Sequence, residues 1–249
     1  MDIDRLAKRR IAVWSGPRNI STALMRSWEN RSDTAVCDEP LYAHYLKETG
    51  LPHPGREEVL ASQENDWREV VLALTGEIPS GKRFYYQKHM AHHLLPRIGR
   101  DWLLKLTNVL LIRDPAEMLT SLIKVTPNPT VLDTGYLQQW ELFAWLRENN
   151  GADPVVLDSR DVLSDPGRHL RALCAVLDVP FDEAMLAWPA GPRPTDGIWA
   201  KHWYSAVEQS TRFAPYRPKP DRVPGEFQTV LEECQDIYDR LAAHRLRSD

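Results

Sequence analysis

The sequence predicts an α/β fold, a doubly wound and mainly parallel sheet flanked by helices. Three observations carry this prediction. Short apolar runs alternate with segments of helical periodicity, a polar loop follows the first run and opens a helix, and no repeat or composition break divides the 249 residues. We therefore expect a single domain over residues 1–249, with a proline- and aromatic-rich closing segment at 188–220 and a C-terminal docking helix at 224–246.

Five apolar runs predict the strands, at 11–13, 34–40, 83–87, 108–112 and 155–157. Apolar residues at helical spacing predict helices at 23–30, at 57–74, after Pro115, at 136–149 and after Pro166. Strands that alternate with helices imply right-handed crossovers, and ligands of such sheets bind beyond the carboxyl ends of the strands. Polar side chains that follow the strands should therefore meet in one crevice.

Composition limits the partners and the compartment. With 31 Lys and Arg against 35 Asp and Glu, the formal net charge of −4 gives no overall attraction to nucleic acid, although a local basic pocket is compatible with it. Cys37, Cys174 and Cys234 are scattered and lack metal-ligand spacing, which favours free thiols in a reducing compartment. The sequence opens with no basic-then-apolar leader, and no run reaches the about 18 apolar residues of a spanning helix. We expect a cytoplasmic protein without a membrane partner, and the sequence leaves the oligomeric state open.

The stretch W-S-G-P-R-N-I-S-T-A-L-M at 14–25 has the features of an anion-binding loop. Gly16 allows backbone N–H groups to approach a ligand, and the first N–H groups of the following helix carry a partial positive charge. Arg18, Ser21 and Thr22 add a cation and two hydroxyls, so a phosphate or sulfate would be held from several sides. The loop lacks the lysine of the G-x-x-x-x-G-K-[ST] pattern of nucleoside triphosphatases. A serine-capped helix start without a ligand is the alternative.

Arg113 and Ser121 are a second anion candidate. Arg113 ends an apolar strand and Ser121 lies about two turns along the next helix, so both reach one phosphate if that helix passes beside it. The alternative is a surface arginine paired with Asp114 or Glu117.

Candidate proton acceptors follow the second and third strands. Lys88, His89, His92 and His93 suit general base chemistry because imidazole titrates near neutral pH. Metal binding and purely structural histidines are the alternatives, and we expect no metal because neither partner cysteines nor a His-Glu pattern is present. Glu39 is either a site carboxylate or a helix cap.

Together these motifs resemble the sulfotransferase family, enzymes that use 3'-phosphoadenosine 5'-phosphosulfate. Residues 14–25 are similar to its 5'-phosphosulfate loop, in particular the bacterial P-R-S-G-S-T version. L-I-R-D-P-A-E-M-L-T-S-L-I-K at 111–124 is similar to its 3'-phosphate motif, an R-D-P with a serine eight residues after the arginine. A third match, 155–182, has the family's strand, its Asp-Pro helix start and its hydrophobic-Pro ending. The three matches occur in the family's order.

The resemblance implies a P-loop nucleotide-kinase-like fold and transfer of a sulfuryl group to a hydroxyl or amine of a small molecule. It also implies roles for particular residues. Lys88 would stabilise the sulfuryl group, and His89, His92, His93 or Glu39 would be the base. The residues implied to bind the donor are Gly16, Pro17, Arg18, Asn19, Ile20, Ser21, Thr22, Arg113, Ser121 and, in the closing segment, Lys201 and Arg212.

The sequence departs from the family in three places. The cytosolic branch has Lys-x-His, whereas this chain has Lys88, His89 and Met90, so the identity of the base stays open. Arg18 replaces a lysine, and no glycine-rich C-terminal cofactor motif is visible.

Two other function classes stay open. One is a nucleotide-dependent small-molecule kinase, which would need magnesium, and the other is a non-catalytic nucleotide-binding or partner module. The acceptor is not identified by the sequence. Aromatic residues that could line its pocket, or belong to the core, are Tyr42, His44, Tyr45, Trp199, Trp203, Tyr204 and Phe213.

Overall fold

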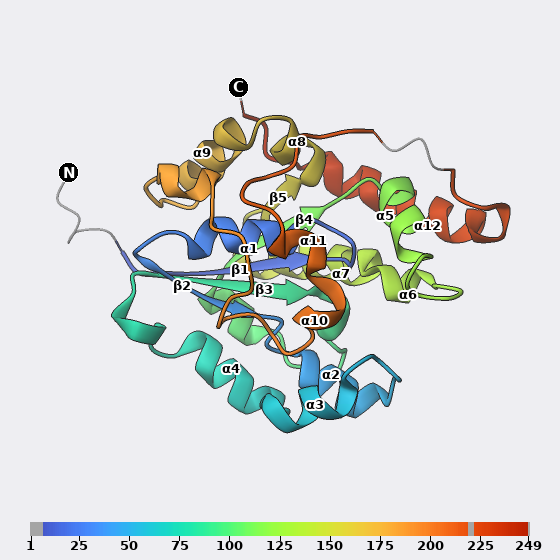
Figure 1. Cartoon of the computed structure of the whole chain (residues 1–249), viewed down its shortest axis with the longest axis horizontal. Coiled ribbons are helices and arrows are strands. Elements are labelled where there is room, and N and C mark those ends of the chain that lie inside the picture. The colour runs from blue at the N-terminus through green and yellow to red at the C-terminus, as the bar shows by residue number, and fades with distance from the viewer. Residues whose placement is uncertain (1–6, 219–221, 249) are drawn as a thin grey trace.

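The computed structural model describes residues 7–218 and 222–248, in which a parallel sheet lies between layers of helices (Figure 1). The strands are β1 (Arg9–Ser15), β2 (Thr34–Asp38), β3 (Phe84–Met90), β4 (Thr107–Ile112) and β5 (Val155–Asp158). They pair in the order β2-β3-β1-β4-β5, and every neighbouring pair is parallel. The predicted doubly wound sheet is confirmed.

The strand order reverses at β1, which has β3 on one side and β4 on the other. The register places Ser15 beside both Met90 and Leu111, so the carboxyl ends of these three strands meet. Such a reversal leaves a crevice above the strand ends, where ligands of open α/β sheets bind.

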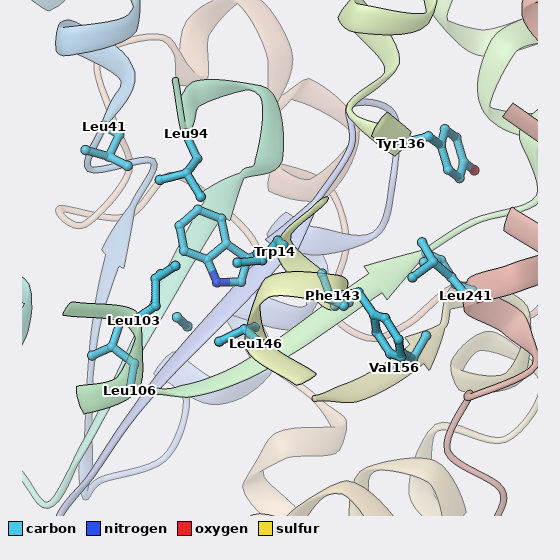
Figure 2. Packing of buried hydrophobic residues seen from close by; sticks show 14 of the residues in the cluster. Trp14, Leu41, Leu94, Leu103, Leu106, Tyr136, Phe143, Leu146, Val156 and Leu241 are labelled. Carbon is cyan, nitrogen blue, oxygen red and sulfur yellow. The ribbon is translucent and has the colours of Figure 1, made fainter. Parts of the chain in front are cut away.

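Side chains of β1 alternate between two buried clusters, as the period of a strand requires. Ile11 and Val13 pack under α1 (Ser21–Glu29) and α9 (Pro166–Val176). Ala12 and Trp14 face α7 (Tyr136–Asn150) and α12 (Gln228–Ala242). Figure 2 shows the indole of Trp14 within this second cluster, with Leu94, Leu103 and Leu146 among the side chains drawn around it.

The region 41–90 differs from the prediction in two respects. The helix predicted at 57–74 is two helices, α3 (Arg56–Ser62) and α4 (Trp67–Thr75), and α2 (Tyr42–Thr49) precedes them. Gln63 breaks the helix because its backbone is extended, while its side chain binds the N–H of Ala43 and the carbonyl of Glu39. In addition, β3 continues three residues past its predicted end.

The remaining helices connect these layers. They are α5 (Pro115–Leu122), α6 (Val131–Thr134), α8 (Ser159–Ser164), α10 (Ala200–Trp203), α11 (Ser205–Glu208) and the short 3₁₀ turns η2 (Pro79–Gly81), η3 (Ala91–His93), η4 (Asp101–Lys105), η5 (Glu183–Leu186) and η6 (Gly225–Phe227). The middle of the docking helix predicted at 224–246 is observed as α12. In the described part of the chain no helix has the length and apolarity to cross a membrane.

The closing segment folds back over the carboxyl ends of the strands, where α10 and α11 are drawn in orange (Figure 1). Trp199, Ala200 and Tyr204 share a buried cluster with residues of α2 and α3. Residues 219–220 of the predicted segment, and 1–6 and 249 of the predicted domain, lie outside the described residues.

Candidate active site

A cavity of about 480 Å³ lies at the carboxyl ends of β1, β3 and β4. It collects most of the residues that the sequence singled out, from segments as far apart in the sequence as Gly16 and Arg212. The predicted residues in its lining are Gly16, Pro17, Arg18, Asn19, Ile20, Ser21, Thr22, Glu39, Lys88, His92, His93, Arg113, Ser121 and Arg212.

The loop after β1 forms one wall of the cavity. The helix α1 begins after Ile20, whose side chain makes no capping bond, so neither serine nor threonine caps it. Asn19 fixes the loop instead: its amide nitrogen donates to the Leu111 carbonyl (2.9 Å) and its oxygen accepts from the Ile20 N–H (2.8 Å). The alternative of a serine-capped helix start is therefore not observed, and the first N–H groups of α1 are left for another acceptor.

Close packing explains why residue 16 is a glycine, which the sequence did not indicate. A Cβ at this position would lie 2.3 Å from the carbonyl oxygen of Thr134, at the end of α6. Gly135 follows with φ of 77°, and a Cβ there would lie 3.1 Å from the Cα of Gly16. Two glycines thus let the loop and α6 touch backbone to backbone.

Arg18 joins the two anion motifs. Its backbone is left-handed (φ 56°), and its Nε donates to Oγ of Ser121 at 2.9 Å. Arg113 donates to the Arg18 carbonyl at 2.5 Å and pairs with Glu117 at 3.3 Å. Helix α5 therefore passes beside the loop, as a shared anion site requires, although the alternative Arg113–Glu117 pair is present as well. Burial, and then the nearby Arg113 charge, lowers the pKa of Arg18.

Lys88 is buried inside β3 rather than at its end, and all three of its N–H donors have acceptors. Nζ lies 2.8 Å from Asp38, 2.5 Å from Glu39 and 2.8 Å from the hydroxyl of Tyr204. Burial opposes the charge, but the two carboxylates outweigh it and hold the pKa of Lys88 well above its ordinary value. The Tyr204 hydroxyl in turn donates to Asp38 (2.7 Å), so this network ties the closing segment to β2 and β3.

His93 faces Glu39 across this network. Its Nδ1 lies 4.0 Å from the Glu39 carboxylate and has no hydrogen-bond partner among the described residues. The ring is stacked on those of Tyr42 and Tyr45, at centroid distances of 4.7 and 4.6 Å. Burial lowers the pKa of His93 well below its ordinary value and raises that of Glu39. The imidazole is thus neutral near pH 7 and able to accept a proton.

Two predicted site residues lie outside the cavity lining. His89 points into the core, where its ring stacks on Trp14 at 4.1 Å, because successive side chains of a strand face opposite sides of the sheet. Lys201 is half-exposed on α10 and pairs with Glu58 of α3 at 2.5 Å. Neither residue therefore lines the cavity, although His89 was predicted as a candidate base and Lys201 as a donor-binding residue.

Other lining residues were not singled out by sequence as donor or catalytic groups. Tyr42, Tyr45, Trp203, Tyr204 and Phe213 line the cavity, as expected of an acceptor pocket, whereas Trp199 and His44 do not. His53 and Asp133 were missed altogether. His53 comes from the turn after α2, where its Nδ1 lies 2.9 Å from the Tyr42 hydroxyl, and a lone histidine beside prolines carries no local signal.

Comparisons with known proteins identify a family and solved structures of the same fold. A family model described as Sulfotransferase domain matches residues 9–241. Two solved structures share the fold at 14% identity and a TM-score of 0.53. They are the Sulfotransferase Domain from the Curacin Biosynthetic Pathway, with 95% of this chain and 98% of that chain covered, and the Sulfotransferase from Alicyclobacillus acidocaldarius, with 96% and 97% covered.

Two relatives from Arabidopsis thaliana carry a different name. Branched-chain-amino-acid aminotransferase-like proteins 1 and 2 are 38% and 35% identical over 234 residues, which is 94% of this chain but 42% and 41% of those proteins. This chain spans less than half the length of either relative. Its match to the family model covers nearly the whole sequence, and the chain belongs to the sulfotransferase domain family.

Proposed function

We propose that this protein transfers a sulfuryl group from 3'-phosphoadenosine 5'-phosphosulfate to a hydroxyl or amine of a small molecule and releases 3'-phosphoadenosine 5'-phosphate. The observation that carries the proposal is the contact of Arg18 with Ser121. It joins the loop and the arginine–serine motif into one cationic wall, opposite candidate proton acceptors in the same cavity.

The cationic wall fits a nucleotide with two separate phosphate groups. The uncapped N–H groups of α1, with Ser21 and Thr22, would hold the 5' end. Arg113 and Ser121 would hold the 3'-phosphate, and Arg18 would lie between the two groups. Arg212 of the closing segment adds a fourth cation to the lining.

His93 is the proton acceptor that the geometry favours, with His92 and Glu39 as the alternatives. When bound, the donor supplies the sulfuryl group, and the electron pair of its bridging S–O bond leaves with the bisphosphate. The acceptor hydroxyl would give its proton to Nδ1 of His93 while its oxygen forms the new S–O bond. The Glu39 carboxylate, 4.0 Å away, would stabilise the resulting imidazolium.

Lys88 has a positioning role in this proposal. Its three hydrogen bonds orient Glu39 and Tyr204, and a contact with a sulfuryl oxygen would have to replace one of them. The positive charge of Lys88 argues against aminotransferase chemistry at this cavity. A lysine that forms a Schiff base must be neutral, whereas two carboxylates raise the pKa of Lys88.

Calorimetry tests the proposal. We expect the bisphosphate nucleotide to bind with equal affinity with and without magnesium, and the sulfated donor with an acceptor to yield the bisphosphate. Binding that requires magnesium would favour the kinase alternative. Binding without turnover of any acceptor would favour a non-catalytic module, and no binding at millimolar nucleotide would overturn the proposal. A cytoplasmic location remains a prediction.

A further inference from the structure

The cavity has an end of opposite character to its cationic wall. Glu39, which lines the cavity, and the fully buried Asp38 surround Lys88, which has no donor left. A second carboxylate of the lining, Asp133, lies close enough to His92 and His53 for its charge to act on both rings. The arginines of the lining, Arg18, Arg113 and Arg212, belong to the loop, the turn between β4 and α5, and the closing segment. Two carboxylates of the lining, with Asp38 buried behind Glu39, thus accompany one ammonium at this end.

Asp133 is held in place by contacts on both sides. One oxygen, Oδ2, accepts from the backbone N–H (2.8 Å) and the hydroxyl (2.7 Å) of Thr130, which form the capping box of α6. The next two residues, Thr134 and Gly135, touch Gly16 backbone to backbone. Asp133 makes no ion pair with any residue that the structure describes. The Asp133 carboxylate is therefore held in position, and no residue in the described part of the chain forms an ion pair with it.

The imidazoles at this end lack partners too. Nδ1 of His92 and Nδ1 of His93 are buried without a hydrogen-bond partner among the described residues, and both side chains line the cavity. The His93 side chain is only 3% exposed. A buried polar atom without a partner costs free energy, which a ligand with a hydroxyl group would recover.

We propose that this end binds an acceptor that carries a protonated amine besides the hydroxyl group that is sulfated, and that the Asp133 carboxylate recognises the ammonium. The inference rests on the proposed function for the identity of the reacting group. The two carboxylates of the lining, Glu39 and Asp133, disfavour an anionic acceptor. Tyr42 and Tyr45 give this end of the cavity an aromatic lining, which suits an acceptor with an aromatic ring between its hydroxyl and its amine.

Three phenols with para substituents of different charge test the proposal. Tyramine is cationic, 4-ethylphenol is neutral and 3-(4-hydroxyphenyl)propionate is anionic. Calorimetry measures the binding of each to the protein with the bisphosphate nucleotide present and absent. We expect tyramine to bind at least about tenfold more tightly than 4-ethylphenol, and the anionic phenol to bind most weakly. Equal or weaker binding of tyramine would overturn the proposal.

A variant assigns the preference to one residue. Asp133→Asn keeps an oxygen for Thr130 but removes the charge, so the preference for tyramine should fall to about twofold or less. The control Asp236→Asn removes an exposed charge of α12 and should keep the full preference. An unchanged preference in Asp133→Asn would refute the role of Asp133. If the nucleotide fails to bind but tyramine is still preferred, the sulfuryl transfer fails while the ammonium site stands. If Asp133→Asn does not fold, the comparison of the three phenols on the unmodified protein still decides.

Discussion

Two guanidinium groups lie close together in the wall of the cavity, and only one of them has a carboxylate. Arg113 pairs with Glu117, whereas Arg18 is bound to the hydroxyl of Ser121. Burial, and then the Arg113 charge, lowers the pKa of Arg18, which means that its charged form is less favourable here than in water. An anion between the two arginines would offset this unfavourable electrostatic energy. The environment of the Arg18 charge is therefore itself an argument for an anionic ligand.

Arg113→Ala should weaken binding of the 3',5'-bisphosphate nucleotide at least about tenfold, because a hydrogen bond to a charged group contributes about 1.5–3 kcal/mol. Binding of adenosine 5'-monophosphate, which lacks the 3'-phosphate, should change far less. Isothermal titration calorimetry of both nucleotides measures the difference. Arg240→Ala, at a half-exposed arginine of α12, is the control and should leave both affinities unchanged. Equal losses for the two nucleotides would refute the assignment of Arg113 to the 3'-phosphate.

Two of the contacts that hold the closing segment in place are polar and buried. Behind the anion loop, Arg26 of α1 pairs with Asp196 at 2.6 Å, and the two side chains are only 1% and 5% exposed. At the other end, Tyr204 binds Lys88 and Asp38. Because Arg212 and Trp203 line the cavity from this segment, the two anchors place part of the binding site.

Arg26→Met should lower the free energy of unfolding by about 3–5 kcal/mol, because it leaves the buried Asp196 carboxylate without its cation. Urea denaturation followed by circular dichroism measures this change. The control is Arg171→Met, which breaks the exposed pair with Glu183 and should cost less than about 1 kcal/mol. Similar costs for the two variants would show that the Arg26 pair does not anchor the segment.

Elements with a strong local pattern were predictable, and those that depend on distant partners were not. The apolar runs of β1, β4 and β5 identify them as strands, and the helical spacing of α7, α9 and α12 identifies them as helices. The end of β3 was missed because Lys88 interrupts the apolar pattern, and the carboxylates that neutralise it lie 49 and 50 residues away in sequence.

The candidate site was predictable to the same extent. The anion loop and the pair Arg113 and Ser121 could be found because they are short motifs next to strands. His53 and Asp133 reach the cavity only through the folding of the turn after α2 and the contact of α6 with Gly16. His89 was assigned to the site because the predicted strand ended too early. The prediction therefore did not show that His89 belongs to β3 and on which face of the sheet its side chain lies.

At the scale of the whole molecule, β3 and the turn η3 that follows it collect uncharged imidazoles. Burial lowers the pKa of His89 to about 3, that of His92 to about 4, and that of His93 well below its ordinary value. In the unfolded chain each would titrate near 6.5. Below that pH the unfolded chain binds more protons than the folded protein, so folding becomes less favourable as the solution is acidified. Burial lowers the pKa of His53 as well. Glu39 and Asp158 act in the opposite direction because burial raises their pKa values, but they are two carboxyls against four imidazoles.

The free energy of unfolding should therefore fall steadily from pH 7 to pH 5, by up to about 1.4 kcal/mol per pH unit for each imidazole that stays neutral in the folded protein. Urea denaturation at several pH values measures the slope. His92→Gln should make the slope shallower by up to about 1.4 kcal/mol per pH unit, because it removes one of the buried imidazoles. The control His202→Gln, at an exposed histidine of α10, should leave the slope unchanged. A stability that stays constant between pH 7 and pH 5 would mean that the imidazoles take up protons inside the folded protein. In that case burial would not lower the pKa of His93, and the environment of this imidazole would not be the reason that it is neutral near pH 7.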